Sequence, residues 1–375
     1  MTLVTPLLGG MSGAALLLAT AVATAPAGAA GPAASAPFLR PLHTVTRVAS
    51  TVPAGGDLNP YGVAVVPRTR GLLHRGDVLV SNFNNRTNAQ GTGTTIVAVS
   101  PRGHRSVFAR MWARTLPGTC PGGIGLTTAL GVTTSGWVVA GSLPTRDGTA
   151  ATARAGCLLV LDDRGRVRET LTGSGVNGPW DMALSEHGST ANLFVSNVLN
   201  GTVRASGKVV HGGTVLRITL RLRGSRPPER VGTSVIASGL AERSDPDALV
   251  VGPTGLGLGW NDTLYVADTA DNRLAAVTDA SHRTVSAGRG RTVSIGRALD
   301  APLGLAVAPD GDLVTANAGN GNLVETTPAG RQVAVRTVDT SGSPRGAGTL
   351  FGLAVASSRA LYFVDDGTNT LNLLH

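Results

Sequence analysis

The sequence of 375 residues has few aromatic side chains, a single Lys and two Cys. Aromatic residues make up 3% of the chain, so there are few ring faces on which nucleic-acid bases could stack. The formal net charge of +9 comes mainly from Arg, with Lys208 as the only Lys. The longest basic stretch, residues 217–230, fits a solvated strand edge that resists pairing with a neighbour. Nucleic acid is therefore not an expected partner.

Helical periodicity is also missing. After Arg40 no window of about 11 to 18 residues keeps an apolar period of 3.6. Short apolar or alternating runs between Gly, Asn, Asp and Pro are typical of strands instead. The 51 Gly residues suit a protein with many tight turns. These patterns predict an all-β protein.

A short apolar phrase recurs six times, and in five copies it ends in Asn or Asp. The copies are VLVSN (78–82), WVVAG (137–141), LFVSN (193–197), LYVAD (264–268), LVTAN (313–317) and LYFVD (361–365). A second phrase precedes each copy and ends in a small-residue position, at Gly62, Gly131, Asp181, Ala248, Gly304 and Gly352. Repeats of roughly fifty residues built from short strands indicate radial stacking, because one unit cannot bury its own apolar face. We predict a six-bladed β-propeller of four-stranded antiparallel blades.

The propeller is expected to form one domain over residues 40–375, with blade four beginning at residues 248–251. The last blade has three strands before the sequence ends at His375. Residues 43–51 form a β-branched alternating run upstream of blade one. We expect this strand to pair beside residues 370–374 and close the ring, which removes an exposed sheet edge.

Residues 1–36 are interpreted as a targeting segment and a small-residue linker. Residues 13–25 resemble the apolar region of a signal peptide, and Ala-Gly-Ala and Ala-Ser-Ala sequences follow as cleavage candidates. The segment lacks the basic start that signal peptides usually have, so a retained anchor is the alternative. We expect a secreted or periplasmic bacterial protein without a transmembrane domain after signal removal.

The two cysteines, Cys120 and Cys157, are predicted to form a disulfide. An exported chain enters an oxidising compartment, where free thiols are rarely kept. Cys120 lies in the long segment that enters blade two, and Cys157 opens the third strand of the same blade. Both should therefore lie on one face of one blade, within bonding range.

One segment resembles a known repeat family. Residues 266–274, VADTADNRL, resemble the signature of NHL repeats, in which a strand ends in Ala-Asp and an Asn-x-Arg-aliphatic segment opens the next strand. Residues 301–311, APLGLAVAPDG, resemble the start of that repeat. The resemblance spans residues 59–375, with blades two and three departing most. It implies a six-bladed propeller in the broader gluconolactonase-like group, whose members include binders, lactonases and lyases.

The Asn and Asp residues that end the second strand of each blade should surround one face of the propeller. On this face lie the loops from the second to the third strand, called the B–C loops. Such residues often bond their own backbone and shape a turn. The alternative is that inward-facing members offer oxygens to a ligand or to a divalent cation such as Ca²⁺ in the axial channel. The candidate metal ligands are Asn197, Asn317 and Asp365.

Long B–C loops in blades one to three place the expected ligand site in one sector of this face. These loops span residues 83–94, 142–156 and 198–213, and long loops on a rigid scaffold commonly carry binding residues. Trp180 and Asp181 stand where other blades have an apolar residue and Gly. The predicted ligand-binding residues are Trp180, Asp181, Asp247, Asp268, Asn82 and Asn197.

No complete catalytic motif accompanies these residues. The sequence has no G-x-S-x-G, and only His211 of the seven His residues approaches the B–C loop face. Lactonases of the resembled group hold a divalent metal with a Glu, two Asn and an Asp, but the first-blade position for the Glu reads Asn-Pro-Tyr at 59–61. We therefore expect a monomeric binding or scaffold module, rather than an enzyme, for a small molecule, glycan or protein. The alternative is a metal-dependent, lactonase-like hydrolase or a lyase that uses the axial mouth.

Overall fold

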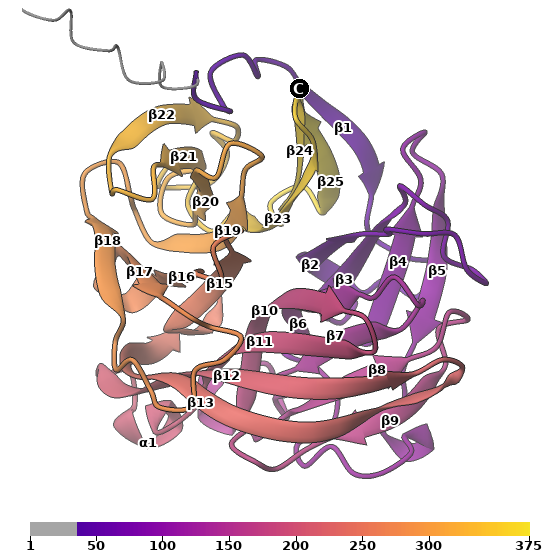
Figure 1. The fold of residues 1–375 in the computed structure, drawn as a ribbon. Helices are drawn as coiled ribbons and strands as arrows, with labels where there is room; N and C mark the ends of the chain where they lie inside the picture. Colours follow the sequence, from indigo (N-terminus) through magenta and orange to yellow (C-terminus); the bar gives the residue numbers. More distant parts are fainter. Residues whose placement is uncertain (1–35) are drawn as a thin grey trace, which may run out of the picture. The chain divides into compact units, whose positions relative to one another are not determined.

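Residues 36–375 are described in a computed structural model, and they form six antiparallel sheets. Figure 1 shows the sheets arranged around an axis. Each sheet is one blade, and its strands are listed from the axis outward. Blade one contains β2 (Leu58–Val65), β3 (Val78–Asn84), β4 (Thr95–Val99) and β5 (Arg105–Arg110), and blade two contains β6 (Leu126–Val132), β7 (Val138–Ser142), β8 (Cys157–Leu161) and β9 (Val167–Leu171). Blade three contains β10 (Gly178–His187), β11 (Thr190–Val198), β12 (Val210–Arg223) and β13 (Arg226–Asp245), to which β14 (Leu249–Val251) is added.

The remaining blades follow the same order. Blade four contains β15 (Pro253–Leu258), β16 (Leu264–Asp268), β17 (Arg273–Val277) and β18 (Arg291–Ile295), and blade five contains β19 (Pro302–Val307), β20 (Leu313–Asn317), β21 (Asn322–Thr326) and β22 (Gln332–Thr337). Blade six contains β23 (Leu350–Ser357), β24 (Ala360–Asp365), β25 (Thr370–Leu374) and β1 (Val45–Ser50). Each inner strand contacts the inner strand of the next blade, and β23 contacts β2. The prediction of a six-bladed propeller is confirmed.

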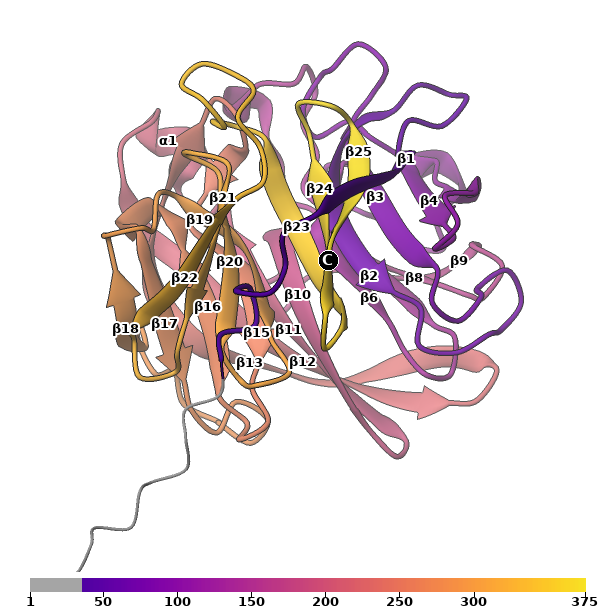
Figure 2. The same ribbon diagram turned by 90° about the horizontal axis from the view of Figure 1, so that it is seen from above.

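The N-terminal strand closes the ring, as predicted. β1 pairs antiparallel with β25, with Val45 opposite Leu374 and Ser50 opposite Thr370 (Figure 2). The segment before β1 is also held, because Leu39 and Leu42 are buried against blades five and six. The buried carboxylate of Glu325 accepts hydrogen bonds from the backbone N–H groups of Phe38 and Leu39, at 2.7 and 2.8 Å. The predicted signal peptide, apart from Ala36, lies outside the described residues.

Glycine recurs on the inner strands because neighbouring blades approach closely there. A Cβ atom on Gly304 would overlap the Phe351 carbonyl oxygen of blade six. In the same way, a Cβ atom on Gly352 would overlap the Tyr61 carbonyl oxygen of blade one. A residue without a side chain is therefore needed at these crossings.

The inner strand of blade four differs from the sequence-based prediction. Residues 248–251 were expected in this position, but β14 pairs with β13, and the inner strand that pairs with β16 is β15. The close approach to blade five occurs at Gly255, where a Cβ atom would overlap the Leu305 backbone nitrogen. Residues 244–251 are thereby left as a connection between blades three and four, called here the axial segment.

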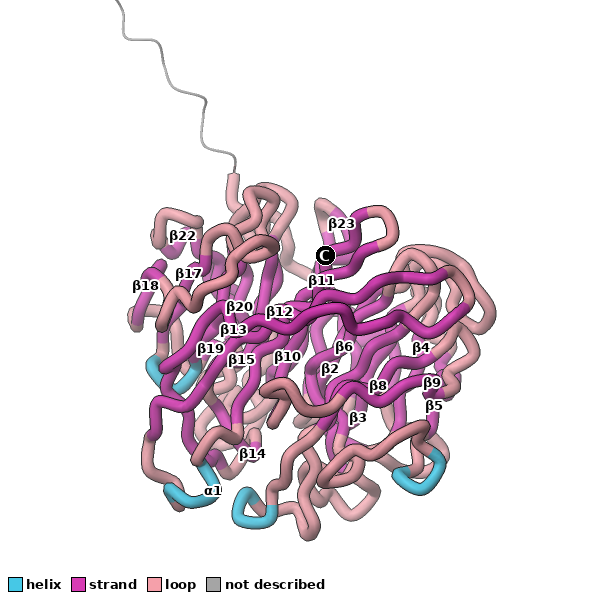
Figure 3. Tube along the Cα trace, turned by 60° about the horizontal axis from the view of Figure 1, so that its bottom comes forward, coloured by secondary structure: helices cyan, strands magenta, loops and turns pink. Residues whose placement is uncertain are grey.

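Blade three is longer than its neighbours. β12 has 14 residues and β13 has 20, and Figure 3 shows both strands running across the molecule. The basic stretch 217–230 covers much of this hairpin, and Arg223 pairs with Glu229 across it. The B–C loops carry short helices, which are α1 (Thr202–Ala205) and two 3-10 turns, Ala150–Thr152 and Thr269–Asp271. No helix among residues 36–375 is long and apolar enough to cross a membrane.

The predicted disulfide is present. Cys120 and Cys157 are bonded, with their Cα atoms 5.4 Å apart. Both cysteines are buried in the core between blades one and two. The bond attaches the segment between β5 and β6 to the first residue of β8, and such bonds are typical of proteins that fold in an oxidising compartment.

Removing the closing strand is expected to destabilise the whole propeller. Deletion of residues 40–52 would expose the edge of β25 and uncover part of the core between blades five and six. We expect a large drop in the temperature of cooperative unfolding, measured by circular dichroism. Arg47→Ala, on the exposed part of β1, is the control and should unfold near the wild-type temperature. A deletion variant that unfolds like the wild type would contradict this role of β1.

Loss of the disulfide is expected to lower the free energy of unfolding. The bond joins residues that are 37 positions apart, and the chain-entropy account of a loop of this size gives about 3–4 kcal/mol. The double variant Cys120→Ser, Cys157→Ser should show this loss in urea denaturation. Reductant should destabilise the wild type and leave the variant unchanged. Equal stability of the two oxidised proteins would refute the estimate.

Candidate functional site

The Asn residues that end the second strands hold the chain as it enters their own blade. The Asn82 side-chain amide donates to the Thr51 carbonyl oxygen at 3.1 Å, and that of Asn317 donates to the Ala298 carbonyl oxygen at 2.7 Å. Asn197 donates to the Gly175 carbonyl oxygen at 3.1 Å. The bonded carbonyl groups lie 19 to 31 positions away in the chain, so these Asn side chains tie two segments of one blade together and do not form the local turn bonds of that alternative.

The candidate metal ligands Asn197, Asn317 and Asp365 end strands of three different blades. The Asn197 side-chain oxygen already accepts hydrogen bonds from the backbone N–H groups of Asn177 and Gly178, at 2.8 and 3.0 Å. The ligand candidate Asp268 is buried and pairs with Arg273 at 2.8 Å. A cation or ligand at these positions stays a prediction.

Aromatic side chains fill the axis near the B–C loop face. Tyr61 stacks on Phe83 and on Phe351, with ring centroids 4.4 and 4.0 Å apart, and Trp180 lies 5.9 Å from Tyr61. Trp180 is 1% exposed, and its indole N–H donates to the Val250 carbonyl oxygen at 2.8 Å. The structure therefore places Trp180 in the core and not on an open surface, because its faces are covered by neighbouring blades and by the axial segment.

Asp181 lies below this aromatic cluster, in a small axial cavity of about 60 Å³. Inner-strand residues of all six blades line the cavity, and Thr128 and Asp181 are its polar side chains. The Asp181 carboxylate accepts a hydrogen bond from the Leu256 backbone N–H of blade four at 3.0 Å. Burial raises the pKa of Asp181 to about 7.

The axial cavity offers few side-chain ligands for a calcium ion. Ca²⁺ takes about six to eight oxygen ligands, mostly from carboxylates and carbonyls. The cavity offers one carboxyl group, whose pKa is raised to about 7 and which already accepts a backbone hydrogen bond. Thr128 is the other polar side chain in its lining.

The axial segment covers the aromatic cluster on the B–C loop side. The Tyr61 hydroxyl donates to the Asp247 carbonyl oxygen at 3.5 Å, and the Gln90 side chain donates to the Pro246 carbonyl oxygen at 2.6 Å. Beside the segment is a cavity of about 340 Å³, a size suited to a small ligand. Its walls come from the B–C loops of blades one and two and from the axial segment. The long loops therefore border a cavity at the mouth, in the sector next to Asp245.

Four carboxyl groups gather at the same mouth, and we call them the mouth carboxyl cluster: Asp247, Asp339, Asp365 and Asp366. Burial is the main cause that raises the pKa of Asp366 to about 7, and the charges of Asp365 and Asp247 add to it. Burial also raises the pKa of Asp365 to about 6, with a further contribution from its hydrogen bond with Asp339. The charges of Asp366 and Asp247 are felt by the buried Tyr61 hydroxyl, whose pKa is well above its ordinary value.

Within residues 36–375 none of the members of this cluster forms an ion pair with Arg, Lys or His, and the nearby Arg243 pairs with Asp245 instead. Among these residues, the acidic and His side chains that converge closely enough for a metal ion lie elsewhere, at Asp262, Asp279 and His282 and at Asp310, Asp312 and Glu325. The sequence analysis named Asp247 and Asp365 but missed Asp339 and Asp366. The Asp-Asp pair at 365–366 is the signal that could have shown the second carboxyl group.

In sequence, the chain matches no protein-family model and no curated protein. In structure it is similar to a gluconolactonase from Xanthomonas campestris, with 14% identity, 88% of each chain covered and a TM-score of 0.54. It is also similar to a luciferin-regenerating enzyme, with 12% identity, 88% and 94% coverage of this chain and that one, and a TM-score of 0.54. A virginiamycin B lyase from Staphylococcus aureus has 14% identity, 88% and 85% coverage and a TM-score of 0.50.

These similarities confirm the expected group of propellers at the level of the fold. They also correct the functional hypothesis from the sequence. That hypothesis preferred a binding or scaffold module, whereas the similar structures are named as a lactonase, a lyase and a further enzyme. The enzyme alternative is therefore better supported than the binding module. The NHL-repeat assignment stays a prediction.

Replacing Asp181 by Asn is expected to stabilise the protein at alkaline pH. The raised pKa means that the folded protein holds this proton more tightly than the unfolded chain, whose carboxyl group ionises near pH 3.8. Stability is therefore lost as the pH rises from 3.8 towards 7. Asp181→Asn removes this loss and should gain roughly 2–4 kcal/mol at pH 8 relative to its effect at pH 4. Urea denaturation at both pH values measures the gain.

Asp300→Asn, at an exposed carboxyl group, is the matched control and should show no such pH-dependent gain. An Asp181→Asn variant whose stability relative to wild type is the same at pH 4 and pH 8 would contradict the buried-proton account.

Proposed function

We propose that this protein is an enzyme that opens a neutral ester or lactone bond by acid–base catalysis at the axial mouth. The observation that carries the proposal is the mouth carboxyl cluster. Two of its members, Asp365 and Asp366, have pKa values of about 6 and about 7, close to neutral pH. Groups with pKa values near the working pH are the most effective proton donors and acceptors.

The roles follow from the environments of the two carboxyl groups. Asp366, whose pKa is about 7, holds a proton near neutral pH and can donate it to the oxygen of the bond that breaks. Asp365 has the lower pKa, about 6, and its carboxylate can accept a proton from an attacking water. In hydrolysis one water is added, and a lactone becomes a hydroxy acid. The scheme uses only these two carboxyl groups and water.

The uncompensated acidic charge favours a neutral substrate. An anion approaching the mouth would be repelled, because no member of the cluster is paired with a cation among the described residues. A lactone or ester is uncharged, whereas its product carries a carboxylate. The same field therefore weakens product binding and assists release. The cavity beside the axial segment would hold the remainder of the substrate.

Elimination is the second candidate reaction at this mouth. A carboxylate whose pKa is raised by burial is a stronger base, and it could remove a proton next to a carbonyl group. The product would then contain a carbon–carbon double bond, and no water would be added. Absorbance of the conjugated product distinguishes this outcome from hydrolysis.

The compartment and the partners form part of the same proposal. The disulfide between Cys120 and Cys157 supports an extracytoplasmic location, either secreted or periplasmic, reached through the predicted signal peptide. A small molecule is the expected partner, and the NHL-like repeats would supply the scaffold.

Asp366→Asn is expected to reduce kcat/KM by about 10²–10⁴-fold on a neutral lactone or ester, because the variant cannot donate the proton. A panel of aliphatic lactones and esters would be assayed by acid release. The wild-type rate should fall as the pH rises above about 7, as the Asp366 proton is lost, and the variant should lack this limb.

Asp310→Asn, whose side chain is exposed away from the mouth carboxyl cluster, should retain wild-type activity. Circular dichroism would show that both variants keep the fold. Absence of turnover across the panel by wild type, or full activity of Asp366→Asn, would disprove the proposal.

A further inference from the structure

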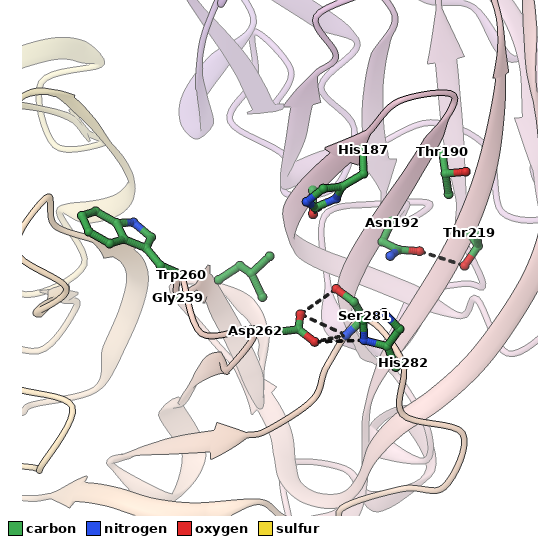
Figure 4. Close-up of a pocket in the computed structure, with 11 residues that line it drawn as sticks. His187, Thr190, Asn192, Thr219, Gly259, Trp260, Asp262, Ser281 and His282 are labelled. Atoms are coloured by element: carbon green, nitrogen blue, oxygen red, sulfur yellow. Dashed lines mark hydrogen bonds and ion pairs between the residues drawn. The ribbon is translucent and has the colours of Figure 1, made fainter.

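A third cavity, of about 710 Å³, opens between blades three and four on the face opposite the B–C loops (Figure 4). One wall comes from the hairpin of β10 and β11, together with Thr219 of β12. The other comes from the turn between β15 and β16 and from the loop after β17. It is separate from the mouth carboxyl cluster and shares no residue with it.

Trp260 forms part of this cavity and is 84% exposed. An indole ring is usually buried, because covering its large apolar surface is favourable. The backbone here holds it outward: the Gly259 N–H donates to the Thr263 carbonyl oxygen at 2.8 Å, and the Asp262 N–H donates to the Gly259 carbonyl oxygen at 3.1 Å. The ring is therefore presented to solvent on a closed turn.

The turn that carries Trp260 is hydrogen-bonded to the loop after β17, which belongs to the same wall of the cavity. The Ser281 hydroxyl donates to the Asp262 carboxylate at 2.6 Å, and the Ser281 backbone N–H donates to it at 3.0 Å. Figure 4 shows these bonds between the two loops. Because the turn is held in this way, Trp260 and the loop after β17 form one preorganised wall.

The facing wall offers directed hydrogen-bonding groups. The Asn192 side-chain oxygen accepts from the Thr219 hydroxyl at 2.9 Å, which fixes the amide and leaves its N–H₂ group without a protein partner among the described residues. His187 lies 3.2 Å from the Ser185 hydroxyl through Nδ1, so Nε2 remains for a ligand. In Figure 4 the amide nitrogen of Asn192 and the ring of His187 lie on the side of the turn that carries Trp260, whose indole ring extends from that turn away from them.

The charges of the residues that line this cavity limit the class of ligand that it can bind. The chain has 32 Lys and Arg residues, yet none of them lines this cavity. A phosphate or sulfate ligand would lack the Arg or Lys partners that such groups need. An open aromatic face beside amide, hydroxyl, imidazole and carboxylate groups suits a ring with an apolar face and hydroxyl edges.

We propose that this cavity is a binding site for a neutral oligosaccharide, with Trp260 stacking on one sugar ring and Asn192 and His187 bonding hydroxyl groups of another. The site is additional to the enzyme activity proposed at the axial mouth and lies on the opposite face. It would hold the protein on a glycan or retain an extended sugar substrate while the mouth remains open.

The test is binding of cellotriose, maltotriose and chitotriose to the full mature protein, measured by isothermal titration calorimetry. At least one trisaccharide should bind with a Kd below about 10 mM. Trp260→Ala should weaken this binding about tenfold or more, because the stacking surface is lost. Trp260→Phe should lose less, and Asn192→Leu should also weaken binding.

Trp112→Ala is the matched control, since Trp112 is 49% exposed but lies outside this cavity. It should bind like the wild type. The proposal fails if no neutral trisaccharide binds below about 10 mM, if Trp260→Ala binds as the wild type does, or if a sulfated trisaccharide alone binds. Binding that survives in Trp260→Ala and is lost in Asp366→Asn would assign the sugar to the axial mouth instead.

Discussion

Close contact between the inner strands is the constraint on which the rest of this propeller depends. The strands can approach only where one of them lacks a side chain, as at Gly304 and Gly352, so the ring is narrow at its centre. The space that remains along the axis is filled by Tyr61, Trp180 and Phe351, together with Phe83. Because the axis is filled, the polar groups that could bind or react with a ligand lie at the mouth and in the turns between blades.

Blade three shows how the ring tolerates an exception. Asp181 occupies the position of the small residue, and its carboxyl group bonds the backbone of blade four. The close contact between blades three and four is kept, but a titratable group is buried as a result.

The basic chain also contains an acidic mouth. Arg residues extend along outer strands such as β12, while Asp247, Asp365 and Asp366 meet near the axis. Net charge alone therefore says little about the ligands of this protein.

The fold could be predicted from the sequence because its signals are local and repeated. The six strand phrases, the missing strand of blade six and the two cysteines each specify a pairing without knowledge of packing. The inner strand of blade four was missed because residues 245–251 imitate the repeat, although Gly255 makes the close contact. Trp180 was predicted as a ligand-binding residue, because no sequence pattern shows which part of the axis is filled. The cavity beside Trp260 joins turns of two blades, and only the assembled ring brings them together.

The pairing of β1 with β25 has a consequence for the order of events during synthesis. The first strand of the propeller pairs with its last strand, so blade six stays incomplete until residues 370–374 have been made. Blades one to five can form their hairpins as they are synthesised, but the ring cannot close before β25 is available to pair with β1. Because the ring closes last, the chain can still pass through a narrow pore before closure. Resistance to mechanical pulling and to proteolysis is then gained in a single late step.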